Sequence, residues 1–243
     1  YKPGVPLDDL LSIISDIDGW IIRSGTKIQK NHILKAKKLQ VIGRAGVGTD
    51  NIDIESATLN GVVVMNVPDG NTVSAAEHTL AMISALSRNI QLGHMGLING
   101  SWDRHKLVGH ELRGKILGVV GLGKIGREVI KRALSFDMKI LGYDPYVSQD
   151  NFDDSEIKVV SIDELTKSSD YISLHVPFND KTKDLFDLKR MKMMKKTSKI
   201  INVARGGIIN ENDLAEALNQ EIISGAAIDV FINEPIDENH KLI

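Results

Sequence analysis

The 243-residue sequence contains no cysteine, and aromatic side chains make up only 5% of it. The lack of cysteine excludes disulfide bonds, thiol catalysis and zinc–thiolate sites within these residues. No apolar run approaches the roughly 20 residues that a membrane-spanning helix needs, and no secretory signal opens the sequence. We therefore expect a cytoplasmic protein without membrane association.

The sequence also lacks a charge excess of either sign. It has 30 basic and 32 acidic residues, with a formal net charge of −2, whereas a nucleic-acid surface needs a basic face. Residues 181–199 are locally basic, but Leu188, Met191 and Met194 recur there at helical spacing, which favours a solvated helix face. We expect no nucleic-acid partner and no metal site.

Strand and helix patterns alternate along the whole sequence, which predicts an α/β fold with parallel sheets. Strands are expected at residues 20–23, 41–45, 62–66, 115–120, 138–143, 157–160, 171–176, 199–203 and 225–230. Helices are expected around residues 7–14, 32–39, 54–59, 73–88 and 210–218, and a capping box at Ser161–Glu164 begins another. Residues 89–114 are rich in glycine, histidine and polar side chains, so we expect the helix at 73–88 to join two domains and a polar connector to follow it.

The most informative motif is Gly121-x-Gly123-x-x-Gly126, which directly follows the apolar run 115–120. Such glycines permit a tight turn and let the backbone approach a pyrophosphate at the start of a helix. The motif alone is weak, but Ile125 and Val129 continue it at helical spacing, and a strand pattern follows. This βαβ context predicts a dinucleotide-binding site.

Asp144 stands at the end of that next strand, eighteen residues beyond Gly126. A carboxylate there can accept hydrogen bonds from the adenine-ribose hydroxyls, whereas it would repel the 2′-phosphate of NADP. Two like charges about 4 Å apart repel by roughly 1 kcal/mol in water and by about 4 kcal/mol at an effective dielectric of 20. The cofactor is therefore expected to be NAD. The alternative is that Asp144 only caps the following turn.

Further polar residues follow other expected strands, at the edge where parallel sheets bind ligands. Arg205, between small residues in the segment 202–207, could grip a carboxylate with two parallel hydrogen bonds; alternatively it is a surface arginine in a glycine turn. Asp229 could accept hydrogen bonds from a nicotinamide carboxamide, or cap a helix. Glu234 could orient a histidine and raise its pKa, or be a solvated loop residue.

None of the seven histidines is an obvious acid–base residue. We expect His175 to pack near the dinucleotide and His78, on the helix at 73–88, to be buried or interfacial. His94, His105 and His110 fall in the polar connector. His240 lies near Glu234, but its surroundings are typical of the approach to another strand, whereas this fold presents working groups at strand exits.

Five segments in this order resemble the D-isomer-specific 2-hydroxy acid dehydrogenases: residues 44–51, 73–78, 121–126, 202–207 and 227–235. The resemblance implies two Rossmann-like parallel-sheet domains. Residues 1–91 would be a flavodoxin-like substrate domain lacking its first strand. Residues 92–243 would be a doubly wound NAD-binding domain whose C-terminal part, including a Pro-His motif with the catalytic histidine, is missing.

The same resemblance assigns roles to individual residues. Arg205 would bind and polarise the 2-oxo acid, and Glu234 would support the proton-exchanging histidine. Arg23, Ser24, Arg44 and Gly46 would line the substrate side, although Arg44 could instead pair with a neighbouring acid. The cofactor-binding residues would be Val47, Gly121, Gly123, Lys124, Ile125, Gly126, Asp144, His175, Val176, Pro177, Val203, Ala204 and Asp229.

Residues 23–27, 101–104 and 109–112 most resemble the branch of that family that oxidises 3-phospho-D-glycerate in serine biosynthesis. Arg23 and Arg44 could supply donors for the phosphate. The alternatives are a glyoxylate or hydroxypyruvate reductase and, from another class, a non-catalytic NAD-sensing scaffold. The resemblance further implies a homodimer formed through the NAD domain and a small-molecule 2-hydroxy or 2-oxo acid substrate.

Overall fold

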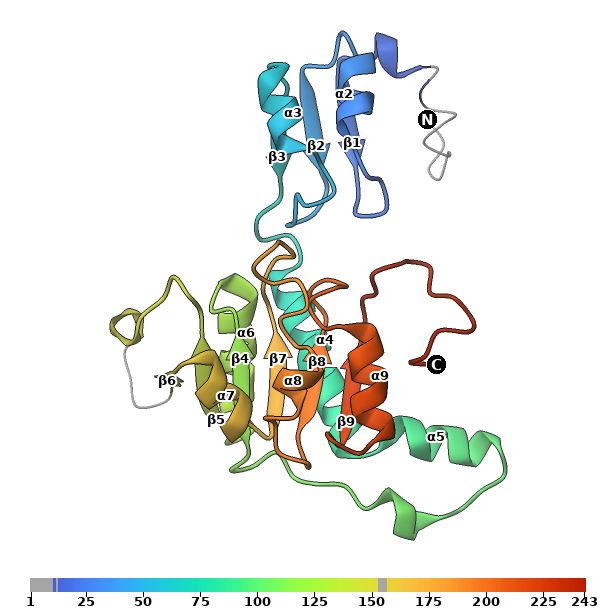
Figure 1. The fold of residues 1–243 in the computed structure, drawn as a ribbon, viewed down its shortest axis with the longest axis vertical. Coiled ribbons are helices and arrows are strands. Elements are labelled where there is room, and N and C mark those ends of the chain that lie inside the picture. The colour runs from blue at the N-terminus through green and yellow to red at the C-terminus, as the bar shows by residue number, and fades with distance from the viewer. Residues whose placement is uncertain (1–10, 12, 153–156) are drawn as a thin grey trace. The chain divides into compact units, whose positions relative to one another are not determined.

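The computed structural model describes residues 11, 13–152 and 157–243. The chain divides into two compact units, Tyr1–Asn71 and Thr72–Ile243 (Figure 1). Most of the helix expected at residues 7–14 lies outside the described residues. No described helix has the length and apolar character needed to cross a membrane.

The smaller unit is built on a parallel three-stranded sheet with the order β1-β2-β3. Its elements are η1 (Ile14–Asp16), β1 (Gly19–Ile22), α2 (Lys30–Lys35), β2 (Val41–Arg44), α3 (Ile54–Leu59) and β3 (Val63–Asn66). Trp20 and Ile22 are buried in its core, whereas Ile21 between them is 80% exposed. This alternation shows that the helices cover one face of the sheet.

The larger unit contains a six-stranded parallel sheet with the order β6-β5-β4-β7-β8-β9. The strands are β4 (Ile116–Val120), β5 (Lys139–Tyr143), β6 (Ile157–Val159), β7 (Tyr171–Leu174), β8 (Lys199–Asn202) and β9 (Gly225–Ile228). The helices are α4 (Thr72–Ser87), α5 (Ile90–Ile98), η2 (Arg104–Leu107), α6 (Lys124–Leu134), η3 (Gln149–Asn151), α7 (Ile162–Ser168), α8 (Leu188–Met191) and α9 (Glu211–Asn219). The expected α/β class with parallel sheets is therefore confirmed.

Helices cover both faces of this sheet. Leu80 of α4 and Val129 of α6 belong to one apolar cluster. Leu165 of α7, Met191 of α8 and Leu214 of α9 belong to the other. Strands between two such layers are apolar on both sides, and all four residues of β7 are buried.

Local sequence signals explain where several of these helices begin. The Ser161 hydroxyl accepts a hydrogen bond from the backbone N–H of Glu164 at 3.2 Å, and the Asn210 amide oxygen accepts one from Asp213 at 3.1 Å. Both side chains satisfy backbone donors that a helix start leaves without partners. The expected beginnings of α7 and α9 are therefore confirmed.

Two expectations differ from the structure. The units divide after Asn71 rather than at residue 91, because α4 packs on α6, β8 and β9 of the larger unit. The expected polar connector contains the helix α5, and no residue of α5 is buried. The helix was not predicted because Gly93 and Gly96 lie within it, and glycine has a low helix propensity.

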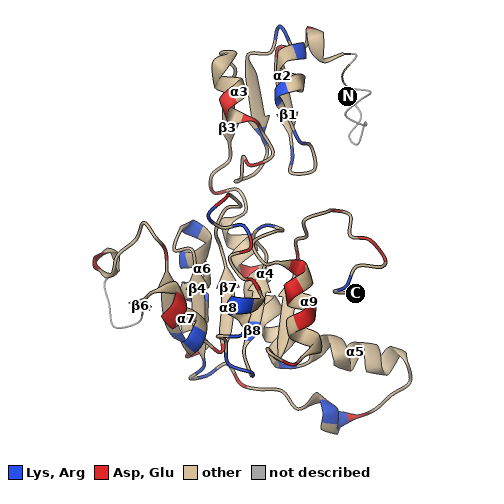
Figure 2. Ribbon diagram, viewed as in Figure 1, with Lys and Arg blue, Asp and Glu red and all other residues tan. Residues whose placement is uncertain are grey.

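Acidic and basic residues are both spread over the larger unit, as the balanced composition indicates. Acidic residues lie on α9, and basic residues lie on α8 (Figure 2). In the basic segment 181–199, Met191 and Met194 are buried, while Lys189 and Lys192 are exposed. The exposed lysines agree with the expected solvated face, although the helix there, α8, is only four residues long.

Candidate functional site

The candidate site begins with the strand register of the larger unit. Val120 is paired with Tyr143 and with Leu174, Leu174 with Asn202, and Asn202 with Ile228. The residues that directly follow these strand ends therefore form one row along the carboxyl edge of the sheet. The row consists of Gly121, Asp144, His175, Val203 and Asp229.

The strand order reverses within this row. β4 leads by way of α6 to β5 on one side, whereas β7 lies on its other side. In open α/β sheets, ligands bind outside the carboxyl ends of the strands at such a switch point. The fold thus assembles the polar residues singled out in the sequence where a ligand crevice is expected.

The glycine turn after β4 is shaped by close backbone contacts. A Cβ atom added to Gly121, whose φ is +97°, would lie 2.5 Å from the carbonyl oxygen of His175. One added to Gly126 would lie 2.0 Å from the carbonyl oxygen of Gly121, so α6 approaches the turn as closely as glycine allows. Gly123 faces open space instead, with no atom within 4 Å of an added Cβ.

Gly123 is also the N-cap residue of α6, so the cap position has no side chain that could bond to the helix start. The first N–H groups of a helix lack intrahelical partners and attract anions. An open glycine followed by such a helix start fits a pyrophosphate. Lys124 and Ile125 occupy the first turn of α6.

Asp144 is held by two backbone donors. Its Oδ2 accepts a hydrogen bond from the N–H of Leu122, in the glycine turn, and its Oδ1 accepts one from the N–H of Tyr146, both at 2.9 Å. The turn-capping role considered above is therefore present. Each carboxylate oxygen can accept a second hydrogen bond, so this role leaves capacity for ribose hydroxyls.

His175 lies next in the row, and its backbone N–H donates to the carbonyl of Val120 at 2.7 Å. Its Nε2 is 2.8 Å from the Ser173 hydroxyl. Burial lowers the pKa of His175 to about 4, so the imidazole is neutral at physiological pH. Val176 contacts the glycine turn, where its Cγ1 would lie 3.0 Å from a Cβ on Gly121; Pro177, which follows it, is exposed.

The turn that carries Arg205 is fixed by Asn202, which is only 2% exposed. The Asn202 Nδ2 donates to the carbonyl of Arg205 at 2.9 Å, and its Oδ1 accepts from the N–H of Ala204 at 3.0 Å. The Arg205 guanidinium is half-buried and donates from Nη1 to the Ala204 carbonyl at 2.6 Å. Sequence reasoning missed Asn202, because a buried amide at a strand end has no pattern of its own.

Asp229 makes a contact with a histidine that the sequence did not reveal. Its Oδ1 lies 3.4 Å from Nε2 of His78 on α4, and both side chains are about half exposed. His78 is therefore not buried within this chain, whereas the expectation that it is interfacial stays a prediction. No sequence signal links a residue in a helix before β4 with one after β9, because only the packing of α4 on β9 brings them together.

Glu234 lies in the loop after β9, where its Oε1 accepts a hydrogen bond from the N–H of Phe231 at 3.0 Å. His240 does not pair with it. The His240 Nε2 lies 3.0 Å from Oε2 of Glu211, at the start of α9. The structure thus brings Arg205 and Asp229 to the same sheet edge. Glu234, five residues after Asp229, is exposed.

The expected substrate residues of the smaller unit lie at the carboxyl edge of its own sheet. Arg23 follows β1 directly, and Arg44 ends β2, paired in register with Ile22. Arg23 and Ser24 are exposed. The Arg44 Nη1 donates to the Ala45 carbonyl at 3.0 Å, and its side chain folds over Gly46.

Val47 belongs to the same loop of the smaller unit. Its carbonyl oxygen accepts a hydrogen bond from Nδ2 of Asn66 at 2.7 Å, and the carbonyl oxygen of Gly46 accepts one from the N–H of Val67 at 3.0 Å. The loop after β2 is therefore held to the end of β3.

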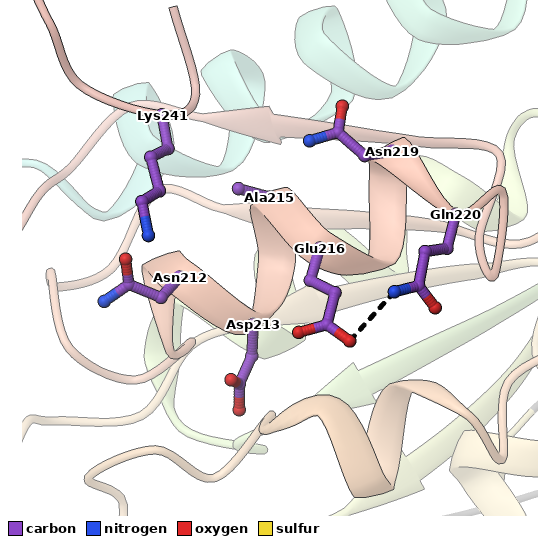
Figure 3. A pocket seen from close by; sticks show the side chains of 7 residues that line it. All are labelled: Asn212, Asp213, Ala215, Glu216, Asn219, Gln220 and Lys241. Atoms are coloured by element: carbon purple, nitrogen blue, oxygen red, sulfur yellow. Dashed lines mark hydrogen bonds between the residues drawn. The ribbon is translucent and has the colours of Figure 1, made fainter.

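Two shallow hollows adjoin α9, and neither is lined by a residue of the row. The larger, of about 380 Å³, is lined by Asn212, Asp213, Ala215, Glu216, Asn219, Gln220 and Lys241 (Figure 3). The smaller, of about 260 Å³, is lined by Asn210, Glu211, Asn212, Ile232, Asn239, His240 and Lys241. Among the described residues, no group of three or more acidic or histidine side chains is placed to hold a metal ion.

Comparison with known proteins gives a consistent result. The family model described as D-isomer specific 2-hydroxyacid dehydrogenase, NAD binding domain, matches residues 80–243. The D-3-phosphoglycerate dehydrogenase of Methanocaldococcus jannaschii is 47% identical over 240 residues, which cover 98% of this chain and 46% of the relative. The chain spans less than half the length of the curated relatives it matches.

Solved structures are similar over nearly the whole chain. The NAD-dependent formate dehydrogenase from Staphylococcus aureus, in complex with NAD, is 36% identical with a TM-score of 0.88, covering 96% of this chain and 71% of that one. A glyoxylate reductase from Paecilomyes thermophila is 28% identical with a TM-score of 0.88, covering 97% and 75%.

Proposed function

Because this chain belongs to the D-isomer-specific 2-hydroxyacid dehydrogenase family, we propose that it acts in the NAD-dependent oxidation of a D-2-hydroxy acid. The observation that carries the proposal is the row of Gly121, Asp144, His175, Val203 and Asp229 at the switch point of the sheet. Residues 80–243 match the model of the family's NAD-binding domain. When bound, NAD supplies the hydride acceptor.

In this proposal, the glycine turn and the start of α6 bind the pyrophosphate, while Asp144 accepts hydrogen bonds from the adenine ribose. Asp229 accepts hydrogen bonds from the nicotinamide carboxamide and so selects the ring face. His175, held neutral by burial, packs against the dinucleotide without adding charge. The remaining cofactor contacts would come from Val47, Val176, Pro177, Val203 and Ala204.

Arg205 is proposed to bind the substrate carboxylate and polarise the carbonyl at C2. A guanidinium presents parallel donors that match two oxygens, and the Asn202 clamp holds its backbone in place. Oxidation also needs a group that takes the hydroxyl proton as the hydride leaves. In this family resemblance that group is a histidine, and Glu234 would orient it. The hydrogen bond from Phe231 occupies Oε1 of Glu234 and leaves its other oxygen available to an imidazole.

We propose that the substrate is 3-phospho-D-glycerate, in serine biosynthesis, and that Arg23 and Arg44 donate hydrogen bonds to its phosphate. The support is the 47% identity to a D-3-phosphoglycerate dehydrogenase. The test is turnover by the complete gene product with NAD and either 3-phosphoglycerate or unphosphorylated D-glycerate. We expect a clear preference for the phosphorylated acid. Equal rates with the two acids, or reduction of glyoxylate alone, would contradict the proposed substrate. A lack of turnover with any 2-hydroxy acid would contradict the proposed dehydrogenase activity.

We also propose that the protein is a homodimer through its larger unit. Ile90, Leu92, Met95, Leu97 and Ile98 of α5 are each more than half exposed. In the picture α5 extends outward from the end of α4 (Figure 1). An exposed apolar helix of this kind is typical of a surface that a partner covers, and a second copy of the chain is the proposed partner.

A further inference from the structure

The segment after β9 is fastened to the start of α9 by a single carboxylate. Oε1 of Glu211 accepts a hydrogen bond from the N–H of Ile232 at 2.7 Å, and Oε2 lies 3.0 Å from Nε2 of His240. The Glu211 side chain is only 13% exposed and that of His240 23%. An acidic residue in the first turn of a helix also interacts favourably with the helix dipole, but here both oxygens are directed at the segment 232–240.

The hydrogen bonds of His240 define how its ring is used. Its Nδ1 accepts the N–H of Leu242 at 3.3 Å, so the proton lies on Nε2, which donates to Glu211. The ring also meets Phe231 edge to face, with centroids 5.5 Å apart. Both ring nitrogens of His240 therefore have partners, and its ring packs against Phe231.

Phe231 and Ile232, which this pair holds, lie against the Arg205 turn. A Cβ atom added to Gly206 would lie 2.1 Å from the carbonyl carbon of Phe231 and 2.5 Å from the nitrogen of Ile232. The N–H of Phe231 in turn donates to Glu234. The backbone at 231–232 thus contacts the residue after Arg205 and orients the side chain of Glu234.

We propose that Glu211 and His240 are positioning residues of the dehydrogenase site. They hold the backbone at 231–232 so that Arg205 and Glu234 keep the geometry needed for turnover, and neither is assigned a contact with substrate or NAD. The inference rests on the proposed function. A displacement of about 1 Å in a reacting constellation can lower the rate by about 100-fold.

The first test compares Glu211→Ala and Glu211→Gln in the complete gene product. We expect Glu211→Ala to lower kcat by roughly 10- to 100-fold, with the dissociation constant for NAD changed less than about twofold, because the glycine turn and Asp144 are untouched. Glu211→Gln keeps the oxygen for Ile232 but turns an amide donor toward the Nε2 proton of His240, so we expect an intermediate loss.

Glu216→Gln is the matched control. Glu216 lies on the same helix and is exposed. It lines the same hollow as Lys241, but its Oε1 accepts a hydrogen bond from Nε2 of Gln220 at 3.0 Å and not from residues 231–232 (Figure 3). The Glu216→Gln substitution removes the same charge from α9 as Glu211→Gln does but leaves the hydrogen bonds to Ile232 and His240 in place, so kcat should stay at the wild-type value. Should Glu211→Ala fail to fold, His240→Ala serves instead, since it leaves the caps of α9 intact and should lower kcat in the same way.

A second readout does not depend on activity. Amide hydrogen exchange at residues 204–207 and 231–232 should accelerate about tenfold or more in Glu211→Ala and not in Glu216→Gln. If the wild-type protein shows no turnover, the proposed function fails, while this exchange still decides whether Glu211 holds the loop. Unchanged exchange, or wild-type kcat in both Glu211→Ala and His240→Ala, would overturn the positioning role.

Discussion

Asn202 shows how a single buried side chain can define the geometry of a functional turn. Its amide oxygen and nitrogen bond to Ala204 and Arg205 and so satisfy the backbone where the chain leaves β8. A buried amide is stable only when its hydrogen bonds are made, so the turn and the side chain specify each other. The position of Arg205 is therefore set by a residue that does not itself contact a ligand in the proposed mechanism.

We expect Arg205→Lys to lower turnover severely while leaving NAD affinity nearly intact. A lysine ammonium cannot reproduce the planar grip on a carboxylate and a carbonyl. Each charge-assisted hydrogen bond lost is worth roughly 1.5 to 3 kcal/mol, which corresponds to about tenfold to more than a hundredfold in rate. Steady-state kinetics of the complete gene product, with calorimetry for NAD, measure both quantities. Unchanged kinetics would exclude the role.

NAD should bind in clear preference to NADP, and Asp144→Ala should narrow the difference. The reason is the repulsion between the carboxylate and the 2′-phosphate, roughly 1 to 4 kcal/mol, or about fivefold to a thousandfold in affinity. Because Asp144 also bonds to Leu122 and Tyr146, the affinity for NAD itself should fall in the variant. Calorimetric titration with both cofactors gives the ratio. Equal wild-type affinities would contradict the assignment.

His175 makes the larger unit sensitive to acid. Its pKa is lowered from 6.5 to about 4, so the unfolded chain binds the proton first, and stability is lost as the pH falls from about 6.5 to about 4. The loss is at most about 3 kcal/mol, because one pKa unit corresponds to about 1.4 kcal/mol. Urea unfolding at pH 7 and pH 4.5 should show a smaller decrease for His175→Gln than for the wild type. The exposed His94 provides the control variant His94→Gln, which should behave like the wild type.

At the scale of elements, the sequence predicts well whatever depends on local chemistry. The strands β4, β5 and β7 stand out as apolar runs, and Ser161 and Asn210 correctly indicate where α7 and α9 begin. The sequence predicts less well where tertiary packing decides. The contact between His78 and Asp229 and the pair of Glu211 with His240 join residues from distant segments, so neither has a local signal.

The helix α5 was not predicted from the sequence because it contains glycines, but it offers the clearest test of dimer formation. Replacing Leu92, which is 64% exposed, by Glu places a charge on the proposed dimer surface. Burying an unpaired charge is costly, so we expect the variant to be monomeric while the wild type is a dimer. Light scattering after size-exclusion chromatography measures the mass. An equal mass for both proteins would reject α5 as the interface.

For the molecule as a whole, binding and turnover should be separable. A protein of residues 1–243 should bind NAD through its larger unit but turn over D-2-hydroxy acids about 10² to 10⁴ times more slowly than the complete gene product. The resemblance assigns proton transfer to a histidine that follows a proline, and none of the seven histidines here does so. His240 is already engaged by Glu211 and Leu242. Equal turnover would contradict this prediction, because the proton-transfer group would then lie within residues 1–243.

The row of residues at the ends of the strands has a consequence for how this protein can change. Each member is the first residue after a strand whose register is fixed by its neighbours. Adding one residue inside a strand would shift its member by about 3.3 Å and turn the side chain to the opposite face. The lengths of these strands are therefore the least tolerant part of the chain, whereas loops away from the row can accept insertions.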